Sequence, residues 1–118
     1  PPYGSRVATK TNVAMSRITE ILDSRAKEVI KELDFEFTTR LFIWKLMDRY
    51  EVDYVDMLVE AYNLRNDNPK IFHNLHSQIG RYLLNNKDNL QIENIGEIKE
   101  PDINPFGRET STQCWRKL

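Results

Sequence analysis

Residues 35–64 decide the fold, and they read FEFTTRLFIWKLMDRYEVDYVDMLVEAYNL. This stretch is the densest block of large apolar side chains in the sequence. Leu41, Phe42 and Leu46 recur at a spacing of three to four residues, which is typical of an amphipathic helix. Trp44 falls to the side of this stripe, so the apolar arc is wide. A wide arc predicts a helix that is buried on more than one side.

A short polar break divides this stretch. Residues 51–53 interrupt the apolar pattern. Asp53 can accept a hydrogen bond from the free backbone N–H groups of a new helix, and Asp56 follows three residues later, as in a capping box. We therefore expect a second helix to start near Tyr54 and to end within the polar residues 63–68, so that the two helices form a hairpin or a helix-turn-helix corner. The expected inward face of the second helix consists of Tyr54, Val55, Leu58, Val59, Ala61 and Tyr62.

Helical patterns lie on both sides of this stretch. Over residues 13–33 apolar side chains recur at three-to-four spacing, and the outer face alternates acidic and basic residues as a solvated helix face does. A fourth helix is expected over residues 69–86. Asn68 suits its N-cap, and Pro69 suits the first helical position because the missing N–H of proline would be unpaired there anyway.

The two ends lack helical periodicity. Residues 1–12 contain two prolines and a glycine and predict an extended arm, which is either inert or used for docking. In residues 90–98 the apolar side chains are spaced by two or three, which fits neither a helix nor a strand well. The alternatives are a short strand at residues 90–95, an extended segment lying on the bundle, or pairing of residues 90–98 with another chain. Residues 87–118 as a whole predict an extended tail. The fold class predicted is therefore all-α, with a bundle of about four helices over residues 13–86 and extended tails.

Composition excludes several classes of protein. The 118 residues are 30% charged and 40% hydrophobic, which suits a single soluble helical domain. A net charge of −1 and a pI of about 6.2 give no overall attraction to nucleic acid or to an anionic membrane. No apolar run approaches the roughly 20 residues of a membrane span, and no signal peptide is evident. The single cysteine, Cys114, predicts a cytoplasmic or other reducing compartment. A place within a viral or other large assembly is the alternative.

Few residues could carry chemistry. His73 and His76 lie three apart, but zinc usually takes four ligands and further donors are missing, so we predict no metal site and interpret His76 as a packing residue. Asp48, Asp53 and Asp56 could gather near the break, although two of them are explained as caps and first-turn acids. The sequence has no nucleophile with an adjacent base and no GxGxxG, P-loop or HExxH motif. We therefore expect neither an enzyme nor a cofactor.

Isolated aromatic side chains in a polar segment commonly fill a pocket on a partner protein. Such side chains punctuate the ends of this chain. They either anchor a partner or fold back onto the bundle. The candidate partner-binding residues are Tyr3, Phe106, Trp115 and Leu118.

Nucleic-acid binding through the helix corner is the alternative. Arg40, Lys45 and Arg49 are its possible contacts, although their position fits charged side chains that reach past the edge of the core. A recognition helix needs basic or amide side chains on its outer face, whereas the helix after the break presents Asp56 and Glu60. A protein partner is therefore expected before a nucleic acid.

The segment LMDRYEVDYVDMLVEAY, residues 46–62, resembles a short motif in the late-transcription accessory proteins of T4-like phages. In these proteins a helix, a brief break and a Tyr-x-Asp step open the next helix, and Tyr54 and Asp56 occupy the matching positions. The resemblance implies a small helical coactivator that bridges the host RNA polymerase to another factor and does not read DNA itself. The residues themselves predict a non-enzymatic adaptor or accessory subunit that docks through its tails.

Overall fold

The computed structural model describes residues 10–101 and 109–118, with side chains from residue 17 onward. Helices make up most of the first part, and strands follow them. The elements are α1 (Lys10–Lys31), β1 (Glu36–Thr38), α2 (Thr39–Arg49), α3 (Glu51–Asn63), α4 (Ile71–Asn85), α5 (Lys87–Leu90), β2 (Ile92–Pro101) and β3 (Glu109–Lys117).

A three-stranded antiparallel sheet shows that the all-α prediction is wrong, because the fold mixes helices with strands. The strand order β1-β3-β2 places β3 in the middle, where Trp115 lies opposite Phe37 of β1. The strands were hard to recognise in the sequence for two reasons. β1 has only three residues, and the register of β2 against β3 shifts between Asn94 and Gly96. Such a bulge breaks the alternation by which a strand is recognised. Residues 87–118, expected as an extended tail, supply α5, β2 and β3.

The four predicted helices are present, with shifted ends. α1 begins at Lys10, inside the segment expected as an arm. A single residue, Tyr50, separates α2 from α3, with φ −133° and ψ 58°, outside the helical range. α3 begins directly afterwards at Glu51, so Asp53 lies in the first turn and does not cap the helix.

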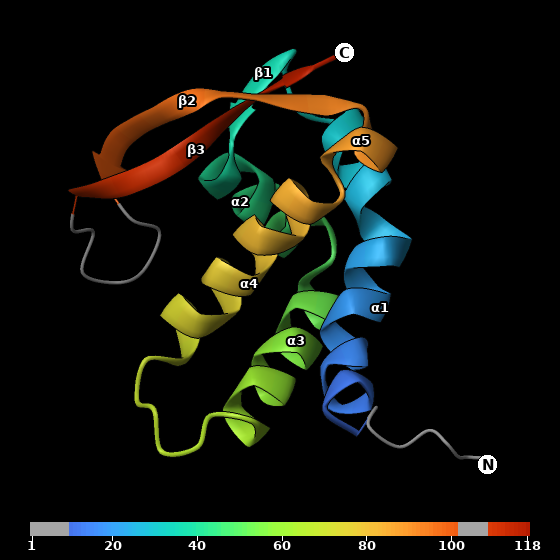
Figure 1. Cartoon of the computed structure of the whole chain (residues 1–118), viewed down its shortest axis with the longest axis vertical. Helices are drawn as coiled ribbons and strands as arrows, with labels where there is room; N and C mark the ends of the chain where they lie inside the picture. The colour runs from blue at the N-terminus through green and yellow to red at the C-terminus, as the bar shows by residue number, and fades with distance from the viewer. Residues whose placement is uncertain (1–9, 102–108) are drawn as a thin grey trace.

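The sheet lies across one end of the helices, as Figure 1 shows. α1, α3 and α4 extend away from it, and α2 lies close to it and packs against both β1 and β3. α1 begins at the end of the molecule far from the sheet. The loop that joins α3 to α4 lies at the same far end.

The core is filled by side chains from the helices and the sheet. Trp115 of the central strand is fully buried, and its Nε1 donates a hydrogen bond to Oγ1 of Thr39 at 2.9 Å. Since Thr39 is the first residue of α2, this contact fixes the sheet to the helices. The other large side chains that are fully buried are Leu22, Val29, Phe42, Ile43, Leu46, Met57, Leu75, Ile79, Leu83 and Ile92.

Arg40 joins α2 to both strands of the β2–β3 hairpin. Its Nη1 donates to the carbonyl oxygens of Glu100 and Thr110 at 2.7 and 2.9 Å. Its Nη2 donates to the hydroxyl of Thr110 and to the carbonyl oxygen of Ser111. Beside it, the Thr38 hydroxyl caps α2 and also donates to Oε1 of Glu100 at 3.3 Å. The first turn of α2 thus holds the hairpin in place.

Candidate docking groove between α3 and α4

An apolar groove of about 300 Å³ runs between α3 and the first turn of α4. Its walls are aliphatic and aromatic, without the convergent polar groups that a catalytic site requires. An open apolar surface of this kind is suited to the apolar side chains of another molecule. The lining residues are Val55, Leu58, Val59, Tyr62, Ile71 and Phe72.

α3 presents two rows of apolar side chains. The inner row, formed by Tyr54, Met57 and Ala61, is buried in the core. A second row, the outer row, lies beside it on the helix surface, with residues spaced by three, four and three positions. This is the spacing of the seam in a coiled coil. The exposed fractions of its members run from 48% to 74%, so this row has no cover within the described chain. The outer row consists of Val52, Val55, Val59 and Tyr62.

Three members of the outer row, Val55, Val59 and Tyr62, were expected on the inward face, and that prediction is wrong. A surface helix turns one stripe toward its own core, and the inner row already occupies that stripe. α3 has more apolar residues than one stripe needs. This excess was the signal in the sequence that some apolar residues of α3 stay exposed.

The loop between α3 and α4 sets the position of the far wall. Asn66 and Asp67 have positive φ angles of 48° and 68°, a left-handed conformation that Asn and Asp adopt more readily than other side chains. The Oδ1 atom of Asn68 accepts a hydrogen bond from the backbone N of Lys70 at 2.9 Å, so its side chain holds the loop and does not cap the helix. α4 therefore begins at Ile71, two residues after its predicted start.

The two ends of the groove differ in charge. At the loop end, the Arg65 guanidinium lies 3.8 Å from the centre of the Tyr62 ring, and its Nη1 donates to the Tyr62 carbonyl at 2.7 Å. Lys70 adds a second positive charge immediately before α4. At the opposite end α3 opens with the acidic residue Glu51. The loop thus carries two basic residues and one acidic residue, Asp67, whereas α3 opens with an acidic residue.

A chain of ring contacts connects the groove to the core. Phe72 of the groove wall packs against His76, with ring centres 6.1 Å apart. The Nε2 atom of His76 shares a hydrogen bond with the Tyr54 hydroxyl at 2.7 Å. Burial raises the pKa of Tyr54 to about 12. The wall of the groove is thus fixed to the inner row of α3.

The buried tyrosines make stability sensitive to alkaline pH. Burial, then a hydrogen bond to Oδ1 of Asp23 at 2.6 Å, raises the pKa of Tyr82 above its ordinary value. An unfolded tyrosine ionises near pH 10, whereas Tyr54 in the folded chain keeps its proton up to about pH 12. The stabilisation is therefore complete below pH 10 and is lost as the pH rises from 10 to 12. We expect the free energy of unfolding to fall by roughly 2 kcal/mol or more over this range, measured by urea denaturation.

The control for this prediction is the double variant Tyr54→Phe and Tyr82→Phe. It cannot ionise at these positions, so its unfolding free energy should change much less between pH 10 and pH 12, whatever its value at neutral pH. An equally steep fall in this variant would contradict the assignment to these two side chains.

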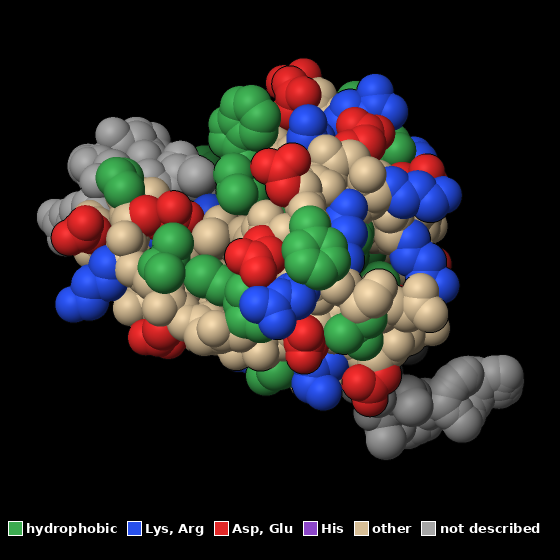
Figure 2. All heavy atoms as spheres, turned by 90° about the horizontal axis from the view of Figure 1, so that it is seen from above, with side chains coloured by type: hydrophobic (Ala, Val, Ile, Leu, Met, Phe, Trp, Pro, Cys, Tyr) green, Lys and Arg blue, Asp and Glu red, His purple; other side chains and the backbone are tan. Residues whose placement is uncertain are grey.

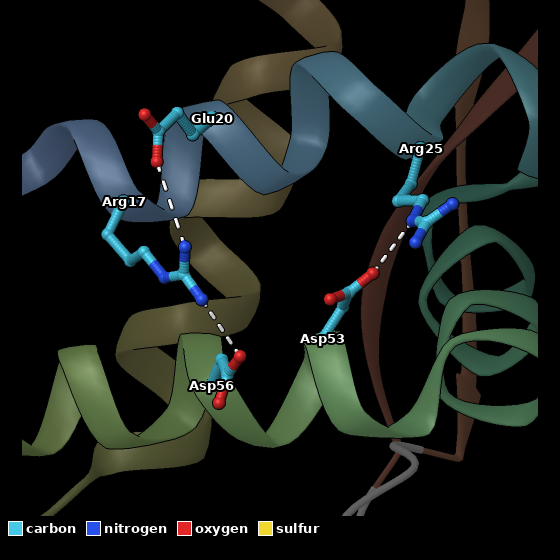
Figure 3. A network of polar contacts seen from close by, with 5 residues as sticks. All are labelled: Arg17, Glu20, Arg25, Asp53 and Asp56. Carbon is cyan, nitrogen blue, oxygen red and sulfur yellow. Dashed lines mark hydrogen bonds and ion pairs between the residues drawn. The ribbon is translucent and has the colours of Figure 1, made fainter.

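On its other side α3 is held to α1 by ion pairs, drawn in Figure 3. Nε of Arg25 donates to Oδ2 of Asp53 at 2.7 Å, and Nη2 of Arg17 donates to Oδ2 of Asp56 at 2.9 Å. Nη1 of Arg17 also lies 3.8 Å from Oε1 of Glu20. The hydrogen bond with Asp53 raises the pKa of Arg25. Exposed pairs add little stability, but these two join α1 to the side of α3 that carries Asp53 and Asp56.

A second hollow, of about 340 Å³, lies between α2 and the end of β2. Leu41, Trp44 and Pro101 form its apolar part, and Trp44 is 54% exposed. Its polar wall is formed by Arg40 and Glu100, which are already joined by a hydrogen bond. This wall therefore serves the hairpin, and the groove beside α3 is the better candidate for docking.

The candidate partner-binding residues lie in different environments. Trp115 has no exposed surface, so its ring completes the core of this chain and is not available as an anchor. The sequence left open whether the aromatic side chains of the tail anchor a partner or fold back onto this chain. Trp115 folds back. Leu118 is largely exposed beyond β3. Tyr3 and Phe106 lie outside the described residues.

The candidate nucleic-acid contacts do not all lie on the surface. Arg40 is buried, and its guanidinium serves the hairpin, which removes it from the predicted site. Arg49 pairs with Glu32, with 3.0 Å between Nε and Oε2, and Lys45 is partly buried. Figure 2 shows the face at the sheet end, where basic side chains are interspersed with acidic ones. Such a mixture provides no continuous basic patch for phosphates on that face.

Most of the residues considered for metal binding and acid–base chemistry are engaged in hydrogen bonds or ion pairs within the fold. His73 is exposed, and His76 is bonded to Tyr54. Asp53 and Asp56 pair with α1, as described above. Within residues 10–101 and 109–118, no group of three or more His, Cys, Asp or Glu side chains could hold a metal ion. In the same ranges, no helix combines the length and the apolarity that a membrane crossing requires.

Comparisons with known proteins do not place the chain in a family. No family model, no curated protein and no solved structure matches it. The resemblance of residues 46–62 to phage accessory proteins therefore stays a prediction. The groove and the outer row are the features from which a function can be inferred.

Proposed function

We propose that this chain is a non-enzymatic adaptor or accessory subunit whose groove between α3 and α4 holds an apolar segment of a protein partner. The observation that carries the proposal is the outer row, which runs along α3 at coiled-coil spacing and is exposed over its length. Isolated apolar residues on a surface need no explanation, but a contiguous apolar row beside a groove commonly marks an interaction site.

The surroundings of the groove support binding rather than catalysis. Its lining is apolar apart from the Tyr62 hydroxyl, and Tyr54 and His76 are bonded to each other beneath the wall formed by Phe72. The ion pairs to α1 and the ring contacts to α4 hold α3 on both sides. A rigid surface of this kind binds a partner without first losing conformational entropy.

The resemblance of residues 46–62 to phage transcription accessory proteins points to the same class of function. These residues cover the end of α2 and nearly all of α3, including the whole outer row. A coactivator that bridges two proteins without reading DNA is one form of adaptor. We keep this identity as a proposal within the broader class.

Site-specific photocrosslinking tests the proposed function. A photoreactive amino acid is placed at Val59 in the groove or, as a matched control, at Leu84 on the outer face of α4. Both side chains are 51% exposed and lie on helices. In the cells that naturally produce the protein, we expect one discrete protein adduct from position 59 and none of that mass from position 84.

The captured protein is then purified and titrated against Val59→Ser and Leu84→Ser. Removing a buried valine side chain costs roughly 1.5 kcal/mol, so Val59→Ser should bind about tenfold more weakly. Leu84→Ser should bind like the unaltered chain. Equal affinities for the two variants, or crosslinks of equal yield at the two positions, would contradict docking in the groove.

A further inference from the structure

We propose that two copies of this chain pair through the outer edge of β2, in an antiparallel arrangement centred on Ile98. This inference does not depend on the groove beside α3 and goes beyond the proposed function. It follows from the direction in which the backbone groups of β2 point and from the order of charges along this strand.

β2 has one edge that no described strand covers. It bonds to β3 on one side only, because the strand order is β1-β3-β2. Its residues 93–99 and 101 are exposed, and the end of the β2–β3 hairpin extends past the helices in Figure 1. The N–H and C=O groups on such an edge form hydrogen bonds with an added strand. A further strand is therefore the chemical complement of this edge.

Two observations identify the residues of β2 that turn their backbone groups to this edge. Nη1 of Arg40 donates to the carbonyl oxygen of Glu100 and to that of its partner on β3, so these two oxygens lie close together between the strands. Pro101, the next residue, has no N–H group and fits where a strand turns its N–H side outward. Because backbone groups alternate along an antiparallel pair, Glu97 and Lys99 also point outward.

The side chains of Glu97 and Lys99 lie on one face of the sheet. The carboxylate of Glu100 accepts a hydrogen bond from the Thr38 hydroxyl at the start of α2, so Glu100 points toward the helices. Side chains alternate along a strand, which places Lys99 and Glu97 on the face away from α2 and Ile98 on the same face as Glu100. Lys99 forms no ion pair with any described side chain of its own chain.

The order of charges selects a second copy of β2 as the added strand. Centring an antiparallel pair on Ile98 places Glu97 of each copy opposite Lys99 of the other. Both residues point outward, so they exchange their backbone hydrogen bonds, and opposite residues share a face. The two ion pairs therefore form on the outer face of the sheet. On the inner face Ile98, which is 47% exposed, meets its own counterpart.

The neighbouring registers match less well. Centring the pair on Glu97 or on Lys99 places two like charges directly opposite each other, which destabilises antiparallel strands. Centring it on Glu100 places Lys99 opposite Pro101, which has no N–H group to donate. The register centred on Ile98 is thus the one in which charge and backbone groups agree.

The two ends of the edge limit this pairing to a short segment. The register shift between Asn94 and Gly96 interrupts the strand at one end, and Pro101 interrupts it at the other. Bulges, prolines and charged residues are the means by which proteins restrict edge pairing. A two-fold pair also occupies the edge of both copies, so assembly stops at the dimer. Because the segment is short, the dimer should be weak and reversible.

Sedimentation velocity of the purified full chain, between about 10 μM and 1 mM, tests this inference. We expect a reversible dimer. Glu97→Lys and Lys99→Glu each place like charges opposite each other in both symmetric pairs, so each should weaken dimerisation roughly tenfold or more. The double variant with both changes restores opposite charges and should restore the dimer. An equimolar mixture of the two single variants should form a mixed dimer for the same reason.

Glu28→Lys and Lys31→Glu are the matched controls. They make the same two changes of charge in an exposed ion pair of α1, and each should dimerise like the unaltered chain. Hydrogen exchange locates the interface. Exchange at the amides of Glu97 and Lys99 should slow as the protein concentration rises, whereas exchange at the amides of α1 should stay constant.

Several outcomes would overturn the inference. These are a chain that stays monomeric at 1 mM, a dimer that both single reversals leave intact, and a double variant that does not regain the dimer. Equal weakening by Glu28→Lys would show that net charge alone governs association. A dimer that Val59→Ser abolishes would use the groove instead of β2. The crosslinking experiment at position 59 is separate, so the proposed function stands or fails independently of the edge.

Discussion

Replacing Trp115 with alanine is expected to lower the free energy of unfolding by about 3–5 kcal/mol. The ring is fully buried in the central strand, opposite Phe37 of β1 and Asn94 of β2, and its Nε1 donates to Thr39 of α2. Alanine would leave a cavity where the sheet meets the helices and would also leave the Thr39 hydroxyl without this donor. Urea denaturation of the isolated chain, followed by circular dichroism, measures the loss.

Two further variants serve as comparisons for Trp115→Ala. Trp115→Phe retains a ring but not the N–H group, so it should cost less than Trp115→Ala and allow a measurement if the alanine variant does not fold. Trp44→Ala removes the same side chain from a position that is 54% exposed, and it should change stability by less than about 1 kcal/mol. Comparable losses for Trp44→Ala and Trp115→Ala would contradict the structural role assigned to Trp115.

Replacing Arg40 with methionine is expected to lower the free energy of unfolding by about 3 kcal/mol. Methionine retains much of the aliphatic stem but donates no hydrogen bonds to the carbonyl groups of Glu100, Thr110 and Ser111. The loss should concentrate in the hairpin. Hydrogen exchange should therefore quicken at the amides of Thr110 to Thr112 more than at those of α1.

Arg49→Met provides the comparison for Arg40→Met. Arg49 pairs with Glu32, and half of its side chain is exposed, so its removal should cost no more than about 1 kcal/mol and leave the hairpin amides unchanged. Arg40→Lys separates charge from geometry, because a single ammonium group lacks the fork that reaches both strands. Full stability in Arg40→Lys would show that charge alone suffices at this position.

Local patterns predicted the helices well. The three-to-four spacing of Leu41, Phe42 and Leu46 depends only on neighbouring residues, and it predicted a helix in the stretch that α2 occupies, although residues 36–38 before it form a strand. The ends of helices were less certain because they depend on single contacts. Asn68, for example, was expected to cap α4 but bonds the loop before it. Such a choice between two local partners is not visible in the sequence.

The sheet depends on contacts between distant residues, which is why it was missed. Phe37 meets Trp115 across most of the described chain, and no local pattern specifies that pairing. For the groove, the sequence contained the apolar excess of α3 but not its orientation. Only the packing of Tyr54 and Met57 into the core, with the ion pairs to α1, leaves Val55 and Val59 on the surface.

The central place of β3 has a consequence for the order in which the chain folds. Pairing Phe37 with Trp115 requires the closure of a long loop, whose entropy opposes folding until the sheet is nearly complete. The contacts that form the groove join residues 55–72, so their closure costs far less entropy. We therefore expect the α3–α4 hairpin to assemble early and strand pairing to follow, so that the groove takes shape before the sheet that completes the core.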